Sequence, residues 1–129
     1  MALAVVFGGG GARGAFQAGV WATIAPYIKP RFVIGSSIGA INGWATTRLA
    51  PEALVTWWLT KAPKRLPPYQ RQALEPLLAD LLALPLRAPW PALAVATPLG
   101  VRVPHVVTLT AKNGLPWLLA SSALPGWYT

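Results

Sequence analysis

The chain has 129 residues, of which 54% are hydrophobic and 11% are charged, so it has the size and the apolar content of one packed domain and is not a disordered chain. The absence of cysteine excludes disulfides, thiolate metal ligands and a cysteine nucleophile, and the single histidine, His105, excludes a metal site built from several histidines. The net charge is +8, and the basic residues are scattered from Arg13 to Lys112, as on a solvated surface. The hypothesis that the chain binds nucleic acid depends on this charge alone, so such binding is not expected.

The first predicted unit is a strand followed by a helix. Residues 2–7 form a short apolar run that ends at four glycines, which is typical of a buried strand passing into a loop. Residues 15–25 then place Phe16, Val20 and Ile24 at four-residue spacing before a proline. This spacing predicts a helix with that apolar face buried.

A second unit of the same kind follows. Residues 32–34 are apolar and favour a strand, and residues 38–49 have the pattern of a helix. Glycine and serine at residues 35–39 separate the two. The order strand, loop, helix, repeated within the first fifty residues, predicts βαβ units and a parallel sheet.

The middle of the chain predicts a proline-rich helical insertion at about residues 51–91. Pro51 suits the first position of an amphipathic helix over residues 51–62. In the leucine-rich stretch 69–84, Pro76 is predicted to divide the helix or to start a new one. The remaining expected elements are strands over residues 92–97 and 105–110 and a short helix over residues 115–122.

The run Gly8-Gly9-Gly10-Gly11-Ala12-Arg13-Gly14 lies between the first predicted strand and its helix. Glycines lack the Cβ that blocks positive φ, so such a loop can turn its N–H groups inward, and the helix start adds partial positive charge. The loop is therefore an expected anion site. Gly9, Gly11 and Gly14 also satisfy the dinucleotide fingerprint G-x-G-x-x-G, but residues 28–38 lack the acidic residue that such a site needs.

The second turn, Gly35-Ser36-Ser37-Ile38-Gly39, is a G-x-S-x-G sequence between strand and helix. A serine at the centre of such a sharp turn projects its hydroxyl at the head of the helix, and the flanking glycines avoid a clash. The alternative is a small-residue turn with Ser36 or Ser37 as the helix cap.

The two turns together are more specific than either alone. Acyl transfer needs a nucleophilic oxygen beside donors aimed at the developing oxyanion, and removal of one such donor costs about 2.7 to 4 kcal/mol of barrier lowering. Two adjacent parallel strands bring both loops to the same edge of the sheet. The pair therefore indicates acyl transfer through Ser37.

Residues 9–20 (GGGARGAFQAGV) and 35–42 (GSSIGAIN) resemble the opening of the patatin-like phospholipase family. Residues 120–127 (ASSALPGW) are similar to the alanine- and serine-rich segment that precedes the catalytic aspartate of that family. The resemblance implies a three-layer α/β/α domain with a mostly parallel central sheet. We expect residues 1–129 to form a single domain of this kind, incomplete at its C-terminal end.

The resemblance also implies the roles of the site residues. Ser37 is the expected nucleophile of a Ser–Asp dyad, and no metal or organic cofactor is needed. The other residues with implied roles are Gly9, Gly10 and Gly11 as oxyanion N–H donors, Arg13 and Gly14 as support for that loop, and Gly35 and Gly39 as the glycines of the elbow.

The family's aspartate stands in a D-G-G or D-G-A motif, which this sequence lacks and which we expect beyond the point where it ends. The carboxylates present are Glu52, Glu75 and Asp80. Ser37, Asp80 and His105 do follow the chain order of an α/β-hydrolase triad. His105 opens a predicted strand, however, and patatin-like enzymes use no histidine base, so a structural role is favoured for it.

The expected function is therefore that of a serine lipid acyl hydrolase, of the phospholipase A or esterase type, acting on a lipid or another acyl ester. The alternative is a lipid-binding or partner-binding fragment of the same fold that does no chemistry, because the dyad aspartate is absent.

Location and membrane contact are predicted from composition. Met1 leads into an apolar run without the basic opening of a secretory signal, and no uncharged stretch is both long enough and free enough of breakers to span a bilayer. The expected location is cytoplasmic. Seven tryptophans add an expected peripheral contact with a membrane surface, against the alternative that they are buried in the core.

Overall fold

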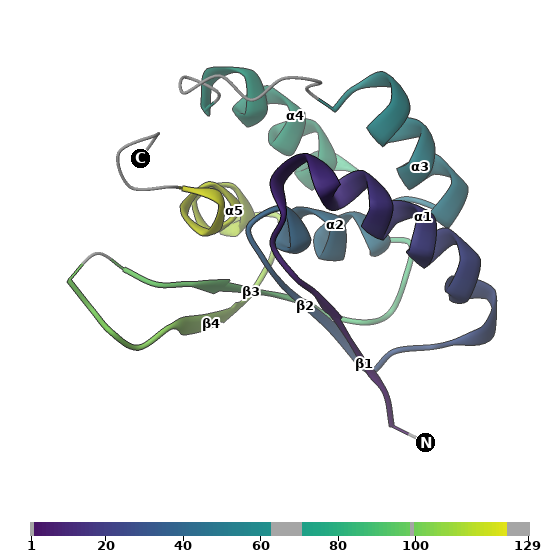
Figure 1. The fold of residues 1–129 in the computed structure, drawn as a ribbon, viewed down its shortest axis with the longest axis horizontal. Helices are drawn as coiled ribbons and strands as arrows, with labels where there is room; N and C mark the ends of the chain where they lie inside the picture. The colour runs from purple at the N-terminus through teal and green to yellow at the C-terminus, as the bar shows by residue number, and fades with distance from the viewer. Residues whose placement is uncertain (1, 63–70, 99, 124–129) are drawn as a thin grey trace.

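The computed structural model describes residues 2–62, 71–98 and 100–123 of the chain (Figure 1). The predicted strands and helices are all present, with boundaries shifted by a few residues. Residues 63–70 of the predicted proline-rich insertion lie outside the described residues. In chain order the elements are β1 (Ala4–Phe7), the 3₁₀ turn η1 (Gly11–Arg13), α1 (Gly14–Ile24), the 3₁₀ turn η2 (Ala25–Tyr27), β2 (Phe32–Ser36), α2 (Ile38–Thr46), α3 (Pro51–Thr60), α4 (Arg71–Ala83), β3 (Ala92–Ala96), β4 (His105–Thr108) and α5 (Gly114–Ser122).

The strands form one sheet in the order β1-β2-β3-β4. β1, β2 and β3 run parallel, and β4 runs antiparallel to β3. In the register of the sheet, Phe7 pairs with Gly35, which pairs with Ala94. The predicted α/β class with a mostly parallel sheet is confirmed, and β1 and β2 end side by side.

The helices of the described residues lie on one face of the sheet (Figure 1). α2 packs on β1, β2 and β3, and α5 packs on β3, while α1 packs on α3 and α4 packs on α5. Alternation along the strands fits this layering: Phe7, Val33 and Ala94 are buried, whereas Val6 and Phe32 are exposed on the other face. Of the three layers expected, the described residues form the sheet and one helical layer.

The middle section of the chain shares its core with the sheet. Leu54 of α3 and Leu78 and Leu81 of α4 are almost fully buried in the same cluster as Val33 of β2. Burial of a leucine side chain stabilises a fold by about 2 kcal/mol. The predicted insertion at residues 51–91 thus supplies two helices to the single helical layer.

The buried face of α1 differs from the prediction. Phe16 is 75% exposed, and Val20 and Ile24 of the same stripe are also exposed, so their assignment to the core is wrong. The residues of α1 that are buried are Gly14, Ala18 and Trp21. Apolar residues lie on both faces of α1, so its local sequence does not select one of them. In the folded chain the buried face includes Trp21, whose ring contacts Phe7 and Trp90 edge to face.

The predicted division at Pro76 is also wrong, because α4 continues through this residue from Arg71 to Ala83. Proline inside a helix removes one hydrogen bond and costs about 3 kcal/mol. Leu78, Leu81 and Leu82 follow Pro76 and are buried against the rest of the core. Tertiary packing therefore offsets the local preference of proline for a break.

The tryptophans of the described residues belong to the core or its edge, and none of them is exposed. The indole N–H of Trp44 donates a hydrogen bond to the Leu81 carbonyl at 3.2 Å, and the Arg48 guanidinium lies 4.2 Å from the centre of the Trp44 ring. Burial lowers the pKa of Arg48. Of the two alternatives stated for the tryptophans, the described rings fit burial in the core, and peripheral membrane contact stays a prediction. Within the described ranges, no helix has the length and the apolar character needed to cross a bilayer.

Candidate active site

Ser37 lies between β2 and α2 in a sharp turn, with φ 56° and ψ −129°. Among the described residues it is the one non-glycine residue with positive φ. A side chain held in so sparsely populated a region costs on the order of 1–3 kcal/mol, and such strain gathers at functional sites. Ser37 is half-buried, and within the described part of the chain its hydroxyl forms no hydrogen bond.

The two glycines that flank Ser37 are required by backbone contacts. A Cβ added at Gly39 would overlap the carbonyl oxygens of Phe7 and Gly8, and a Cβ added at Gly35 would overlap the backbone of Gly39 and Ala40. Backbone atoms cannot rotate away as side chains do. The ends of β1 and β2 and the first turn of α2 therefore meet at a distance that glycine alone permits.

The glycine-rich loop lies directly beside this turn. A Cβ added at Gly9 would stand 3.6 Å from the Cβ of Ser37. Gly11 has φ 56°, which favours glycine, and the Arg13 N–H donates a hydrogen bond to the Gly10 carbonyl at 3.1 Å. The structure thus brings the loop and the serine to one edge of the sheet, and Arg13 closes the loop through its backbone while its side chain is exposed.

Two features make this edge suitable for a negatively charged oxygen. The backbone N–H groups of Gly9 and Gly10 form no hydrogen bond with the described residues. The helices α1 and α2 both begin here, at Gly14 and Ile38, and helix N-termini carry partial positive charge. A Cβ added at Gly14 would stand 2.6 Å from a side-chain carbon of Ile38, so the two helix starts are in close contact.

A buried hydrogen-bond network fixes the loop relative to the elbow. The Asn42 side-chain amide donates to the Gly14 carbonyl and to Gln17 Oε1, both at 2.9 Å, and its Oδ1 accepts from the Trp58 indole at 2.8 Å. Gln17 in turn donates to the Gly8 carbonyl. Sequence analysis assigned no role to Asn42, Gln17 or Trp58, although an asparagine inside the apolar segment 38–49 was a signal of a buried polar contact.

A second contact that sequence analysis missed comes from α5. The Ser37 N–H donates to Ser121 Oγ at 2.8 Å, and the Ser121 hydroxyl donates to the Val95 carbonyl at 2.7 Å. Ser121 belongs to the third matching segment, residues 120–127, of which residues 124–127 lie outside the described residues. Nothing in its local sequence indicates a partner 84 residues away.

Asn42→Ala is expected to lower the free energy of unfolding by about 3 kcal/mol, because it leaves the Trp58 indole and the Gly14 carbonyl without their partner. Urea unfolding followed by circular dichroism measures the change. Asn113→Ala is the matched control, since the Asn113 side chain accepts from the Thr110 N–H and donates to the Thr108 carbonyl, both close by in the sequence. We expect Asn113→Ala to lower the free energy of unfolding by about 1 kcal/mol. Equal losses for the two variants would contradict the idea that the Asn42 network stabilises the fold more than a local turn does.

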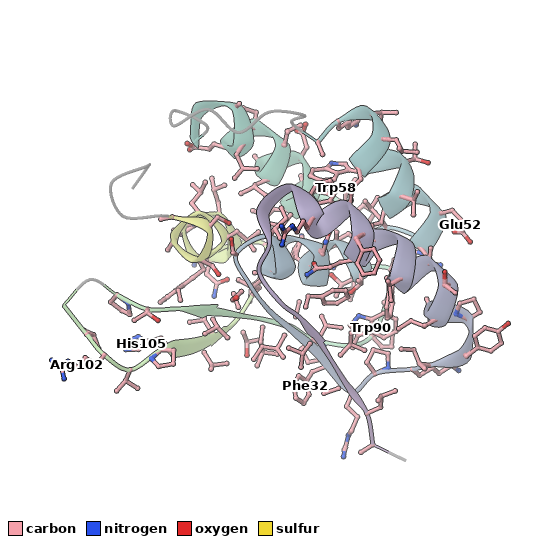
Figure 2. All side chains as sticks on the ribbon, in the orientation of Figure 1. Phe32, Glu52, Trp58, Trp90, Arg102 and His105 are labelled. Atoms are coloured by element: carbon pink, nitrogen blue, oxygen red, sulfur yellow. The ribbon has the colours of Figure 1, made fainter. Side chains whose placement is uncertain are left out.

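In the described part of the chain, no carboxylate or histidine is hydrogen bonded to Ser37. Glu52 is in the first turn of α3, and Asp80 is on the exposed side of α4. His105 is exposed on the β3–β4 hairpin, on the opposite side of the molecule from Glu52 (Figure 2). Within the described residues, no hydrogen bond joins His105 to Asp80 or to Ser37. The order Ser37, Asp80, His105 in the sequence is therefore not matched by a triad in space.

The described residues also hold a cavity of about 550 Å³, which lies away from both glycine turns. Its lining includes Ile28 and Lys29, which precede β2, and Trp90, which precedes β3. It therefore opens toward the N-terminal ends of these strands, whereas Ser37 follows the C-terminal end of β2. No three His, Cys, Asp or Glu side chains of the described residues cluster as metal ligands do.

A comparison with protein-family models gives a match over residues 5–129 to the family described as Patatin-like phospholipase. The matched range contains both glycine turns, the Asn42 network and α5. A search of curated proteins found no match.

Proposed function

This chain belongs to the patatin-like phospholipase family, and from that premise we propose that it is a serine lipid acyl hydrolase with Ser37 as its nucleophile. The family acts on lipids, so the substrate class is a lipid or a related acyl ester. The observation that matters most is the position of Ser37, strained at φ 56° and directly beside Gly9. Within the described residues the N–H groups of Gly9 and Gly10 form no hydrogen bond. A serine hydroxyl beside free backbone donors supports the proposal, because acyl transfer needs both a nucleophile and oxyanion donors.

In the proposed reaction, Ser37 Oγ attacks the carbonyl carbon of the ester and loses its proton to a base. The carbonyl oxygen becomes an oxyanion that faces the N–H groups of Gly9, Gly10 and Gly11, close to the starts of α1 and α2. Collapse of this intermediate breaks the ester C–O bond and releases the alcohol, which takes up a proton. Water then attacks acyl-Ser37 and releases the fatty acid and the free serine.

An apolar stripe beside the site supports a lipid substrate. Phe16, Val20 and Ile24 are exposed at four-residue spacing on α1, and this helix begins directly after the glycine-rich loop. Contiguous exposed apolar surface marks contact sites for lipids, ligands or partners. We propose that the stripe contacts the acyl chain or a lipid surface. A cytoplasmic location with peripheral membrane contact stays a prediction.

One observation favours the second candidate function, a lipid-binding or partner-binding chain without catalysis. Ser37 needs a base, and within the described residues no carboxylate is hydrogen bonded to it. The sequence also contains no D-G-G or D-G-A motif. The fold would then keep the anion-binding loop and the apolar stripe but would not form the acyl-serine.

Labelling by a fluorophosphonate probe decides between these functions. Attack by an activated serine displaces fluoride and leaves a phosphonyl group on Oγ. We expect the intact chain to carry this group on Ser37, as located by peptide mass spectrometry, and Ser37→Ala to carry none. Ser36→Ala is the matched control and is expected to keep the label, because Ser36 lies within β2. Binding of fluorescent lipid vesicles without any labelled serine would instead support the non-catalytic function.

A further inference from the structure

Ser121 of α5 joins two neighbouring points at the C-terminal edge of the sheet. Its Oγ accepts a hydrogen bond from the Ser37 N–H at 2.8 Å and donates one to the Val95 carbonyl at 2.7 Å. Val95 pairs with Ser36 in the register of β2 and β3, so both contacts fall where these two strands end. In Figure 1, α5 lies beside the point at which β2 passes into α2.

The Ser121 hydroxyl is the acceptor of one hydrogen bond and the donor of the other. A hydroxyl has one donor hydrogen, and the Val95 carbonyl takes it, which leaves a lone pair aimed at the Ser37 amide. The register of β2 with β3 stops at Ser36, so the Ser37 N–H follows the last paired residue of the strand. Without Ser121 this half-buried donor would have no partner in the described part of the chain.

We propose that Ser121 is a positioning residue for the hydrolase reaction, an inference that rests on the proposed function. By holding the Ser37 amide, it fixes the peptide plane before Ser37 and thus the direction in which the side chain leaves the strained turn. It also removes the Ser37 N–H from the donors available to an oxyanion, which leaves this role to the glycine-rich loop and the start of α2.

The neighbouring Ser122 provides a matched control. It stands on the same helix and is more deeply buried, at 7% exposure, yet within the described residues its Oγ has no hydrogen-bond partner. Removal of either hydroxyl therefore changes α5 in a similar way, but only the loss of the Ser121 hydroxyl changes the elbow.

The test compares Ser121→Ala, Ser121→Thr and Ser122→Ala in the full chain. We expect Ser121→Ala to slow fluorophosphonate labelling of Ser37 by about 10- to 100-fold, because a small displacement of a nucleophile has effects of this size. Ser122→Ala should stay within about twofold of the unaltered chain. Ser121→Thr keeps the hydroxyl and should restore most of the rate. Unchanged labelling of Ser121→Ala, or equal slowing of both alanine variants, would overturn the proposal.

Amide hydrogen exchange at Ser37 gives a second readout that does not depend on catalysis. Loss of the acceptor should speed exchange of the Ser37 N–H by at least about tenfold in Ser121→Ala, and Ser122→Ala should leave it unchanged. If the unaltered chain takes no label, the proposed function fails, and this comparison alone decides whether Ser121 holds the elbow. Equal exchange in all three proteins would contradict the contact itself.

Discussion

Ser37→Gly is expected to remove hydrolysis and labelling while it raises the free energy of unfolding. The hydroxyl is the proposed nucleophile, and loss of a nucleophilic serine lowers turnover by at least about a thousandfold. At φ 56° and ψ −129°, however, glycine has a lower conformational energy than serine, because it has no Cβ. Ser37→Gly relieves about 1–3 kcal/mol of backbone strain and adds an entropic cost of folding of about 0.5–1 kcal/mol. We therefore expect the free energy of unfolding to rise by about 1 kcal/mol.

Two companion variants separate the strain from the chemistry. Ser37→Ala removes the hydroxyl but keeps the Cβ, so it should lose the label without any gain in stability. Ser36→Gly acts inside β2, where glycine weakens a strand, and should keep the label and lose about 0.5–1 kcal/mol. The measurements are probe labelling and denaturant unfolding. A Ser37→Gly protein less stable than Ser37→Ala would refute the idea that the elbow stores strain.

Gly39→Ala is expected to have the largest effect on the fold. The new methyl group would overlap the carbonyl oxygens of Phe7 and Gly8, which belong to the end of β1 and to the start of the glycine-rich loop. α2 must then move away from β1. This movement would also break the contact between the glycine-rich loop and Ser37. We expect a loss of at least about 3 kcal/mol in the free energy of unfolding, together with loss of labelling.

Gly43→Ala is the control, one helical turn further along α2. Its added Cβ would lie 3.6 Å from a Val33 methyl carbon and 3.7 Å from a Phe7 ring carbon, which is ordinary contact. Because alanine favours a helix over glycine by about 0.5–1 kcal/mol, this variant should be as stable as the unaltered chain or more so. Circular dichroism in urea compares the two. Similar urea midpoints for Gly39→Ala and Gly43→Ala would show that the close backbone contact at Gly39 does not require glycine for a stable fold.

Features that depend on a few consecutive residues were predictable from the sequence. The glycines that follow residues 2–7 and those that flank Ser37 predict tight turns, because other residues do not tolerate the required backbone angles and contacts. The alternation of apolar runs with helical segments then leads to parallel strands, and these place both turns at one edge. The α/β class therefore followed from local patterns.

Tertiary structure decided which apolar face is buried and which distant residues complete the site. Phe16 and Trp21 are both large apolar residues of α1, and the packed helix buries Trp21 while Phe16 stays exposed. Pro76 stays inside a helix because buried leucines follow it. Asn42 and Ser121 reach the two turns only after α2 and α5 pack on the strands. Contacts over such sequence separations depend on the summed free energy of the whole core, which no local pattern records.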